Sequence, residues 1–91
     1  SIPDRATFAV ILQALINYLG KKGHTLHFTP LANMVESVDL SPLHKNYEII
    51  KFLVNAQILS LDSERIFNPT RPVSPPDVIN ALKKILNSIS E

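Results

Sequence analysis

Three histidines are the side chains of this chain best suited to metal binding or acid–base chemistry, and two of them, His24 and His27, lie three positions apart. That spacing puts two imidazoles on one side of a helix, where they can share a metal ion, but on opposite faces of a strand. The surrounding segment, HTLHF, alternates polar and apolar residues and is typical of a short strand. The sequence has no cysteine, and no carboxylate lies within several positions of the pair, so we interpret both histidines as exposed loop residues rather than metal ligands.

No other combination of residues predicts catalysis. The glycines, Gly20 and Gly23, are too few to build a phosphate-binding loop of the G-x-x-x-x-G-K type. Serine, histidine and aspartate all occur, but no spacing brings them together as a triad. The third histidine, His44, is interpreted as a solvated surface residue. We therefore predict a non-enzymatic protein that uses no cofactor, no metal and no small-molecule substrate.

The composition predicts one globular domain. The chain has 91 residues, of which 45% are hydrophobic and 19% are charged, which suits a single modest core and is too apolar for a disordered segment. The formal net charge is +1, whereas a domain held to nucleic acid by charge usually carries a clear basic excess. No apolar run approaches the roughly 18 residues of a membrane span. The lack of cysteine permits an intracellular location, nucleus or cytoplasm, and the opening SIPDRATF suggests a piece of a longer protein or a processed chain.

Apolar periodicity and start signals predict the elements that position these residues. Thr29-Pro30 and Ser41-Pro42 each pair a capping hydroxyl with a proline in the first turn, and Ser74 with Asp77 approximates a capping box. Four prolines in PTRPVSPP exclude regular structure there. The predicted elements are a helix at about 5–19, a short strand at 24–28, helices at 29–38 and 41–57, a hairpin at 58–68, a Pro-rich connection at 69–76 and a C-terminal helix at 75–89.

This order of elements resembles a winged-helix domain, in which a helix-turn-helix is followed by a β-hairpin wing. The predicted fold class is mainly α with a small β-hairpin, a winged helix-turn-helix plus a C-terminal helix, in a single domain over 1–91 with its core at 4–69. The competing interpretation is a plain four-helix domain in which the hairpin is a loop.

The resemblance implies that the second helix of the pair enters the DNA major groove and that the wing lies on phosphates. The candidate DNA contacts are Ser41, His44, Lys45, Glu48, Lys51, Asn55 and Arg65. Glu48 would be repelled by phosphate, although it could accept a hydrogen bond from cytosine. The same helix face is equally explained as a solvated surface in which Glu48 pairs with Lys45 and Lys51. The wing tip, Asp-Ser-Glu-Arg at 62–65, is acidic by one charge and disfavours DNA further.

The apolar residues favour a protein partner instead. At 100° per residue, Leu43, Tyr47, Ile50 and Val54 form one stripe of the predicted 41–57 helix, and Phe52 lies nearly opposite. In the last helix, Val78, Leu82, Ile85 and Ile89 form the core stripe, and Ile79 and Leu86 widen it on one shoulder. We expect the wing or the last helix to cover Phe52, and a partner to contact part of the Ile79 and Leu86 shoulder. The candidate protein interface is Ile49, Phe52, Ile79 and Leu86.

The predicted function is accordingly a non-enzymatic interaction module. It would belong to a larger DNA-, chromatin- or transcription-associated protein and act through protein–protein contact or self-association. The alternative is direct binding of double-stranded DNA through the 41–57 helix and the wing. The link to DNA in both cases comes from the resemblance in fold alone.

Overall fold

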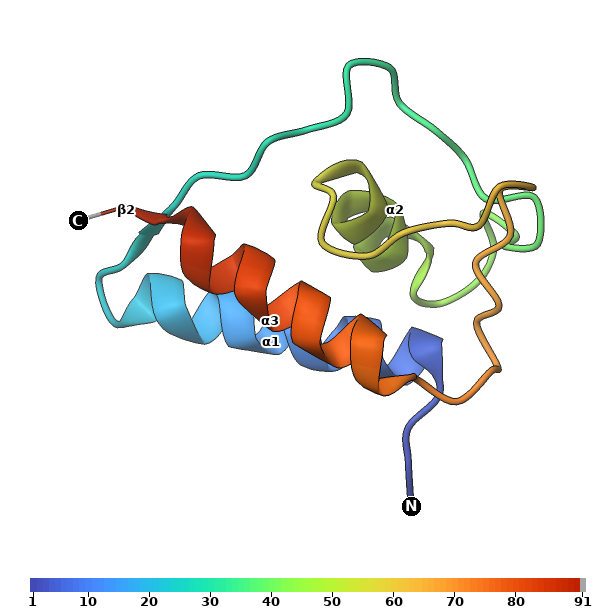
Figure 1. The fold of residues 1–91 in the computed structure, drawn as a ribbon, viewed down its shortest axis with the longest axis horizontal. Coiled ribbons are helices and arrows are strands. Elements are labelled where there is room, and N and C mark those ends of the chain that lie inside the picture. The colour runs from blue at the N-terminus through green and yellow to red at the C-terminus, as the bar shows by residue number, and fades with distance from the viewer. Residues whose placement is uncertain (91) are drawn as a thin grey trace.

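Three α-helices provide most of the regular structure of residues 1–90, the part of the chain that this computed structural model describes (Figure 1). They are α1 (Arg5–Lys21), α2 (Tyr47–Asn55) and α3 (Pro75–Ser88), and the strands β1 (Thr25–Leu26) and β2 (Ile89–Ser90) form a two-stranded antiparallel sheet. The prediction of a mainly helical fold with a small antiparallel sheet is thus confirmed. The finer winged-helix arrangement is not confirmed.

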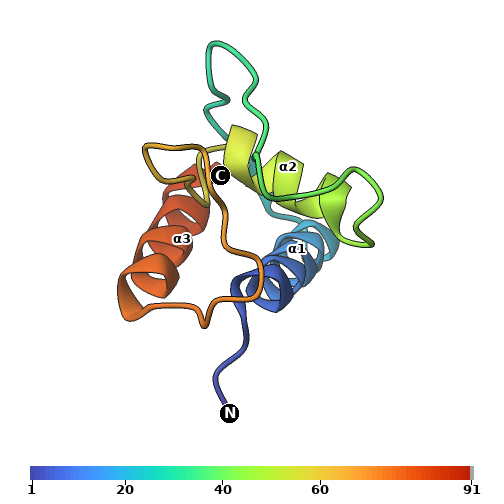
Figure 2. The ribbon, with the colours of Figure 1, turned by 90° about the vertical axis from the view of Figure 1, so that its right-hand side faces the viewer.

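Helices α1 and α3 run side by side in the same direction because they are joined at both ends (Figures 1 and 2). Arg5 at the start of α1 pairs with Asp77 in the first turn of α3. At the other end, β1 follows α1 and pairs with β2, which follows α3. Helix α2 packs against α1 on the remaining side. The core lies between the three helices.

Local capping explains where α1 and α3 begin. The Asp4 side chain accepts a hydrogen bond from the Thr7 backbone N–H, at 2.7 Å, and this bond lowers the pKa of Asp4. At the start of α3, Ser74 and Asp77 form the predicted capping box, with prolines in the first turn. The start of α3 therefore follows its predicted capping signal, and α1 begins at Arg5, as its apolar periodicity predicts.

The buried core draws on all three helices and on one aromatic residue from an irregular segment. Phe67, which follows the turn at 62–66, is fully buried among side chains of the helices. The other fully buried large side chains are Leu12 from α1, Ile50 and Leu53 from α2 and Ile85 from α3. A segment without helix or strand therefore contributes the largest of the fully buried side chains.

The predicted helix at 29–38 is wrong, because this segment hydrogen-bonds to α2 instead of to itself. The Leu31 N–H donates to the Asn55 carbonyl, at 2.8 Å, and the Val35 N–H donates to Asn55 Oδ1, at 2.9 Å. Gln57 Nε2 donates to the Thr29 carbonyl. These tertiary bonds outweigh the helix-start signal of Thr29-Pro30, so residues 27–46 form a long irregular loop.

The helix predicted at 41–57 is shorter than expected and starts at Tyr47. Its first residues form turns, because Ser41 Oγ accepts from the Leu43 N–H, and His44 Nδ1 accepts from the Asn46 N–H. Such side-chain bonds compete with helix formation. Leu43, predicted to lie in the core, is consequently 93% exposed.

The predicted hairpin at 58–68 is also wrong: in the described structure this segment contains no strand. It has a tight turn in which the Asp62 N–H donates to the Ile66 carbonyl, and Asp62 Oδ1 accepts from the N–H groups of Glu64 and Ile66. Beyond the turn, both carboxylate oxygens of Asp39 accept from successive backbone N–H groups, those at 67 and 68. The backbone is therefore paired with carboxylates rather than with a second strand. The sheet that does form uses the predicted strand at 24–28, reduced to β1, and the C-terminal β2.

A buried arginine ties these irregular segments to the helices. Arg5 is 8% exposed, and its Nε donates to the Phe67 carbonyl at 2.6 Å. Its Nη1 donates to Asp77 Oδ2, at 2.6 Å, and its Nη2 to the Ser60 carbonyl, at 2.8 Å. The guanidinium carbon also lies 4.5 Å from the centre of the Phe67 ring. One side chain thus joins the starts of α1 and α3 to the 60–67 segment.

We predict that Arg5→Ala destabilises the domain strongly. The change leaves the Asp77 carboxylate and two backbone carbonyls without their donor, and breaking a buried ion pair from one side typically costs about 3–5 kcal/mol. Urea unfolding followed by circular dichroism measures the loss. Arg71→Ala, which removes an exposed guanidinium, is the matched control and is expected to stay within about 0.5 kcal/mol of the wild type. Equal stability of the two variants would contradict the central role of Arg5.

We also predict a specific loss of stability in acid. Burial alone would raise the pKa of Asp77, but the hydrogen bond and charge of Arg5 outweigh it and lower that pKa. For Asp39, burial is likewise outweighed by hydrogen bonds from Ser37 and from two backbone N–H groups, which lower its pKa. A carboxyl whose pKa is lowered by folding stabilises the protein above its unfolded pKa, and this contribution disappears as pH falls through the folded pKa.

The free energy of unfolding is therefore expected to be level above about pH 5 and to fall below about pH 4. Urea titrations at stepwise pH check this. The double variant Asp39→Asn, Asp77→Asn should be less stable at neutral pH but should lose less stability between pH 5 and 3. If the free energy of unfolding of this variant fell as steeply between pH 5 and 3 as that of the wild type, other carboxyl groups would be the main cause of the acid sensitivity.

Candidate protein-interaction surface

Helix α3 presents an apolar stripe to solvent as well as to the core. Ala81 and Ile85 face inward and are fully buried. On another side of the helix, spaced three and four residues apart, are Ile79, Leu82 and Leu86, which are 53%, 39% and 64% exposed. Leu82, predicted to lie in the core stripe, belongs instead to the exposed one. The exposure of Ile79 and Leu86 agrees with the predicted shoulder.

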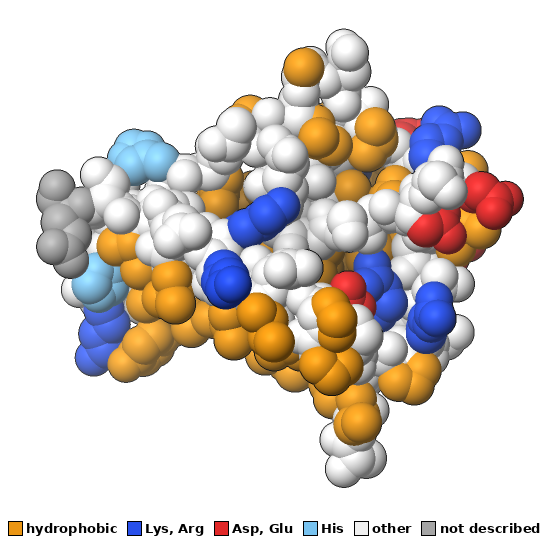
Figure 3. Space-filling model, viewed as in Figure 1, with side chains coloured by type: hydrophobic (Ala, Val, Ile, Leu, Met, Phe, Trp, Pro, Cys, Tyr) orange, Lys and Arg blue, Asp and Glu red, His pale blue; other side chains and the backbone are white. Residues whose placement is uncertain are grey.

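Helix α1 adds two exposed hydrophobic residues beside this stripe. Ile11 and Tyr18 are 51% and 55% exposed, and a separation of seven residues places them on one side of α1. Figure 3 shows the result as a band of hydrophobic side chains along the lower edge of the molecule, over the two adjacent helices. We call this surface the α1/α3 band, and it consists of Ile11, Tyr18, Ile79, Leu82 and Leu86.

The edges of the α1/α3 band are basic. Lys22 Nζ lies 5.6 Å from the centre of the Tyr18 ring. Lys83 is exposed, and because it follows Ile79 by four residues and precedes Leu86 by three, it borders the α3 stripe. Residues 5–35 contain no aspartate or glutamate, and the one acidic residue in the sequence of α3, Asp77, pairs with Arg5. Lysines therefore flank an apolar surface with no free carboxylate on either helix.

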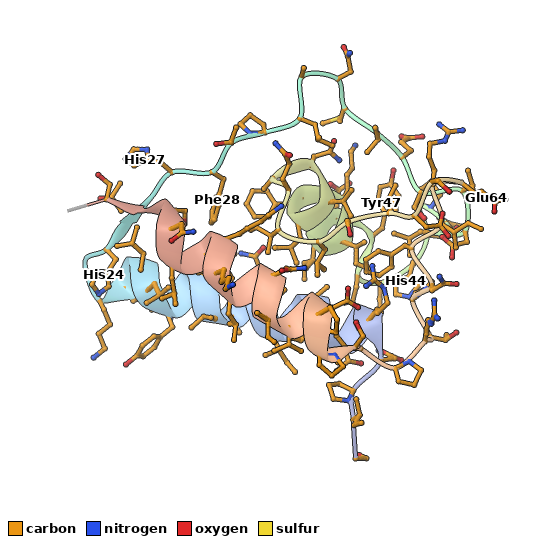
Figure 4. The ribbon with its side chains drawn as sticks, viewed as in Figure 1. His24, His27, Phe28, His44, Tyr47 and Glu64 are labelled. Carbon is orange, nitrogen blue, oxygen red and sulfur yellow. The ribbon has the colours of Figure 1, made fainter. Side chains whose placement is uncertain are left out.

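The two other residues of the predicted interface lie elsewhere. Phe52 is 43% exposed, and its ring contacts Phe28 edge to face, with the ring centres 5.9 Å apart and an interplanar angle of 82°. The expected cover from the wing or the last helix is therefore wrong, since Phe28 of the 27–46 loop makes the contact; Figure 4 labels this ring. Ile49 is half-buried and packs against the core. Neither residue extends the α1/α3 band.

The candidate DNA contacts do not form one row on one helix. Ser41, His44 and Lys45 precede α2 and lie in turns, and only Glu48, Lys51 and Asn55 of the set are helical. The Lys51 ammonium lies 5.8 Å from the centre of the Tyr47 ring. Arg65 belongs to the turn at 62–66, where its carbonyl accepts from the Val38 N–H. Figure 4 shows His44 and Tyr47, labelled, at the end of the molecule that carries this turn.

The Asn55 side chain is engaged in hydrogen bonds within the fold and is therefore not available to contact DNA. Its Oδ1 accepts from the Val35 N–H, and its Nδ2 donates to the carbonyls of Val35 and Lys51, at 3.2 and 2.9 Å. The side chain thus pairs with both backbone groups of one loop residue, as a neighbouring strand would. Sequence reasoning missed this role because the partner is 20 residues away.

Two clefts near the start of α1 contain carboxylates, and each of these carboxylates already has a structural partner. The cleft of about 280 Å³ beside Arg5 and Asp77 is lined by a guanidinium and a carboxylate that already bind each other. A wider one, of about 400 Å³, contains His44 and Asp4, but the Asp4 carboxylate caps α1. His24 and His27 are both exposed (Figure 4), and within residues 1–90 no three metal-ligating side chains come together. No helix in the same range is long and apolar enough to cross a membrane.

Comparisons of this chain with known proteins find no relative. No family model, no curated protein and no solved structure matches the chain significantly.

We predict that Asn55→Ala loosens the 27–46 loop. Three hydrogen bonds are lost and the buried groups left unpaired cost about 1–3 kcal/mol. The Val35 amide should then exchange its hydrogen faster, and limited proteolysis should cut the loop sooner. Lys45→Ala changes an exposed side chain of the same loop and serves as the control. If Lys45→Ala loosened the loop as much as Asn55→Ala, the proposed clamp would be wrong.

Proposed function

We propose that this protein is a non-enzymatic interaction module that binds a protein partner through the α1/α3 band. The observation that carries the proposal is the exposed stripe Ile79, Leu82 and Leu86 on a helix that already packs on the core through the fully buried Ala81 and Ile85. Ala81 and Ile85 seat α3 on the core, so the exposed stripe is not needed to hold the helix in place. A surface of this kind is characteristic of a protein–protein contact.

The composition of the band agrees with an interface. Aromatic residues such as tyrosine supply much of the binding energy when they become fully buried at the centre of a contact, and the apolar residues around them exclude water. The band offers one tyrosine and four aliphatic residues on two neighbouring helices, and each keeps between 39% and 64% of its surface exposed. That remaining surface is available for burial by a partner.

Direct DNA binding is supported less well. Its predicted recognition helix is reduced to nine residues, and Asn55 is occupied by the 27–46 loop. Glu48 stays exposed on the same helix and would repel phosphate. An association with DNA-, chromatin- or transcription-linked proteins was expected from the winged-helix resemblance alone, and the observed elements add no support to it.

The test is site-specific photo-cross-linking in cells that express the protein. A photoreactive phenylalanine in place of Leu86 should give discrete protein adducts. The same group in place of Asn80, an exposed polar residue of α3 outside the band, is the matched control. Adducts of equal yield from both positions, or from neither, would overturn the proposal.

The double variant Ile79→Ser, Leu86→Ser is predicted to fold normally but to lose the adduct. Both side chains are more than half exposed, so we expect the free energy of unfolding to fall by less than about 1 kcal/mol. Thermal unfolding and cross-linking from Leu82, the band residue between them, measure the two effects. Severe destabilisation of this variant would mean that the stripe belongs to the core.

Duplex titration addresses the alternative. We expect no binding of mixed-sequence duplex DNA by the protein at physiological salt. If the charges of Lys45 and Lys51 contact phosphate, Lys45→Ala and Lys51→Ala should each weaken any binding seen at low salt. Each variant should also make the binding constant less dependent on salt concentration. Sub-micromolar affinity at physiological salt would reverse the ranking of the two functions.

A further inference from the structure

We infer that the partner of the α1/α3 band is an amphipathic helix whose apolar side is edged by carboxylates. This inference rests on the proposed function and adds the chemistry of the partner. It follows from the charges beside the band and from the dimensions of the band.

The charges select an acidic partner. Lys22 and Lys83 border the apolar residues, and the two helices carry no free carboxylate to neutralise them. Figure 3 shows most of the red carboxylate atoms of this face at the right-hand end of the molecule, away from the band. A partner with glutamate or aspartate beside its apolar stripe would gain attraction at both lysines, whereas a lysine-edged partner would be repelled at both.

The dimensions select a helix. Ile11 and Tyr18 are seven residues apart on α1, and Ile79 and Leu86 are seven residues apart on α3. At 1.5 Å per residue each pair spans about 10 Å along its helix, or two turns. The two rows run in parallel, so an apolar stripe with i, i+3, i+4 and i+7 anchors matches them in length.

Two other occupants fit less well. A second copy of this chain would bring its own lysine-edged band against this one, and the like charges would oppose pairing. A lipid surface also attracts apolar residues edged by lysine, but such binding relies on side chains that insert into the acyl region. The band residues are only partly exposed on two packed helices, which suits contact with another protein's side chains better than insertion.

The test uses three synthetic amphipathic peptides of identical apolar residues, with glutamate, glutamine or lysine at every flanking position. Fluorescence anisotropy measures their affinity for the wild-type protein. We expect the glutamate peptide to bind about tenfold more tightly than the lysine peptide. The variant Lys22→Glu, Lys83→Glu should reverse that order. Lys45→Glu, Lys84→Glu changes the net charge equally, away from the band, and should keep the wild-type order.

The outcomes separate this inference from the proposed function. If all three peptides bind equally and binding is lost in Ile79→Ser, Leu86→Ser, the band is a protein-binding surface but the acidic preference is wrong. If no peptide binds better to the wild type than to that double variant, the proposal of a helical partner is wrong. Cross-linking from Leu86 then shows separately whether the band binds any protein.

Two further measurements can overturn the choice of occupant. Binding of the protein to phosphatidylserine-containing vesicles, lost in Ile79→Ser, Leu86→Ser, without any peptide preference, would assign the band to a membrane surface. Concentration-dependent dimerisation in sedimentation velocity, lost in the same variant, would assign it to a second copy. A monomer that ignores vesicles and prefers the glutamate peptide supports the inference.

Discussion

A buried guanidinium holds this fold together. A charge removed from water is costly unless its partners are well placed, and Arg5 meets that condition with one carboxylate, two backbone carbonyls and an aromatic ring. Its contacts reach the first turn of α3 and the otherwise irregular segment that contains Phe67. The parallel arrangement of α1 and α3, and hence the joint apolar surface they present, depends on this connection.

Polar side chains also replace secondary structure in the two long connections. Asn55 pairs with the backbone of the 27–46 loop, and the Asp39 carboxylate accepts from the successive backbone N–H groups of Phe67 and Asn68. A buried backbone must find partners for its polar groups. Here those partners are an amide and a carboxylate rather than a neighbouring strand, which explains how so much irregular chain packs around three helices.

The sequence predicts structure that is determined by residues close in the chain, and the prediction fails where contacts between distant residues determine the structure. The start of α3 follows from a capping box within three positions, the place of α1 follows from its apolar periodicity, and the shoulder of Ile79 and Leu86 follows from helical periodicity. The helix at 29–38 and the hairpin at 58–68 were predicted from equally ordinary local signals, yet bonds from Asn55 and Asp39, more than 19 residues away, overrule them. The role of Arg5 was missed for the same reason. Of the predicted interface, Ile79 and Leu86 lie in one band, whereas Phe52 and Ile49 do not.

The contacts of Arg5 also set the order in which the chain can fold as it is synthesised. They join residue 5 to residues 60, 67 and 77, and the sheet joins residue 25 to residue 90. At ordinary rates of translation, roughly several seconds separate the synthesis of α1 from that of its last partners. During that interval the side of α1 that lies beside α3 cannot be covered by it, although α2, which is made earlier, can already pack against α1. The core residues of α1 that contact α3 would therefore stay uncovered on that side until the last part of the chain has been made.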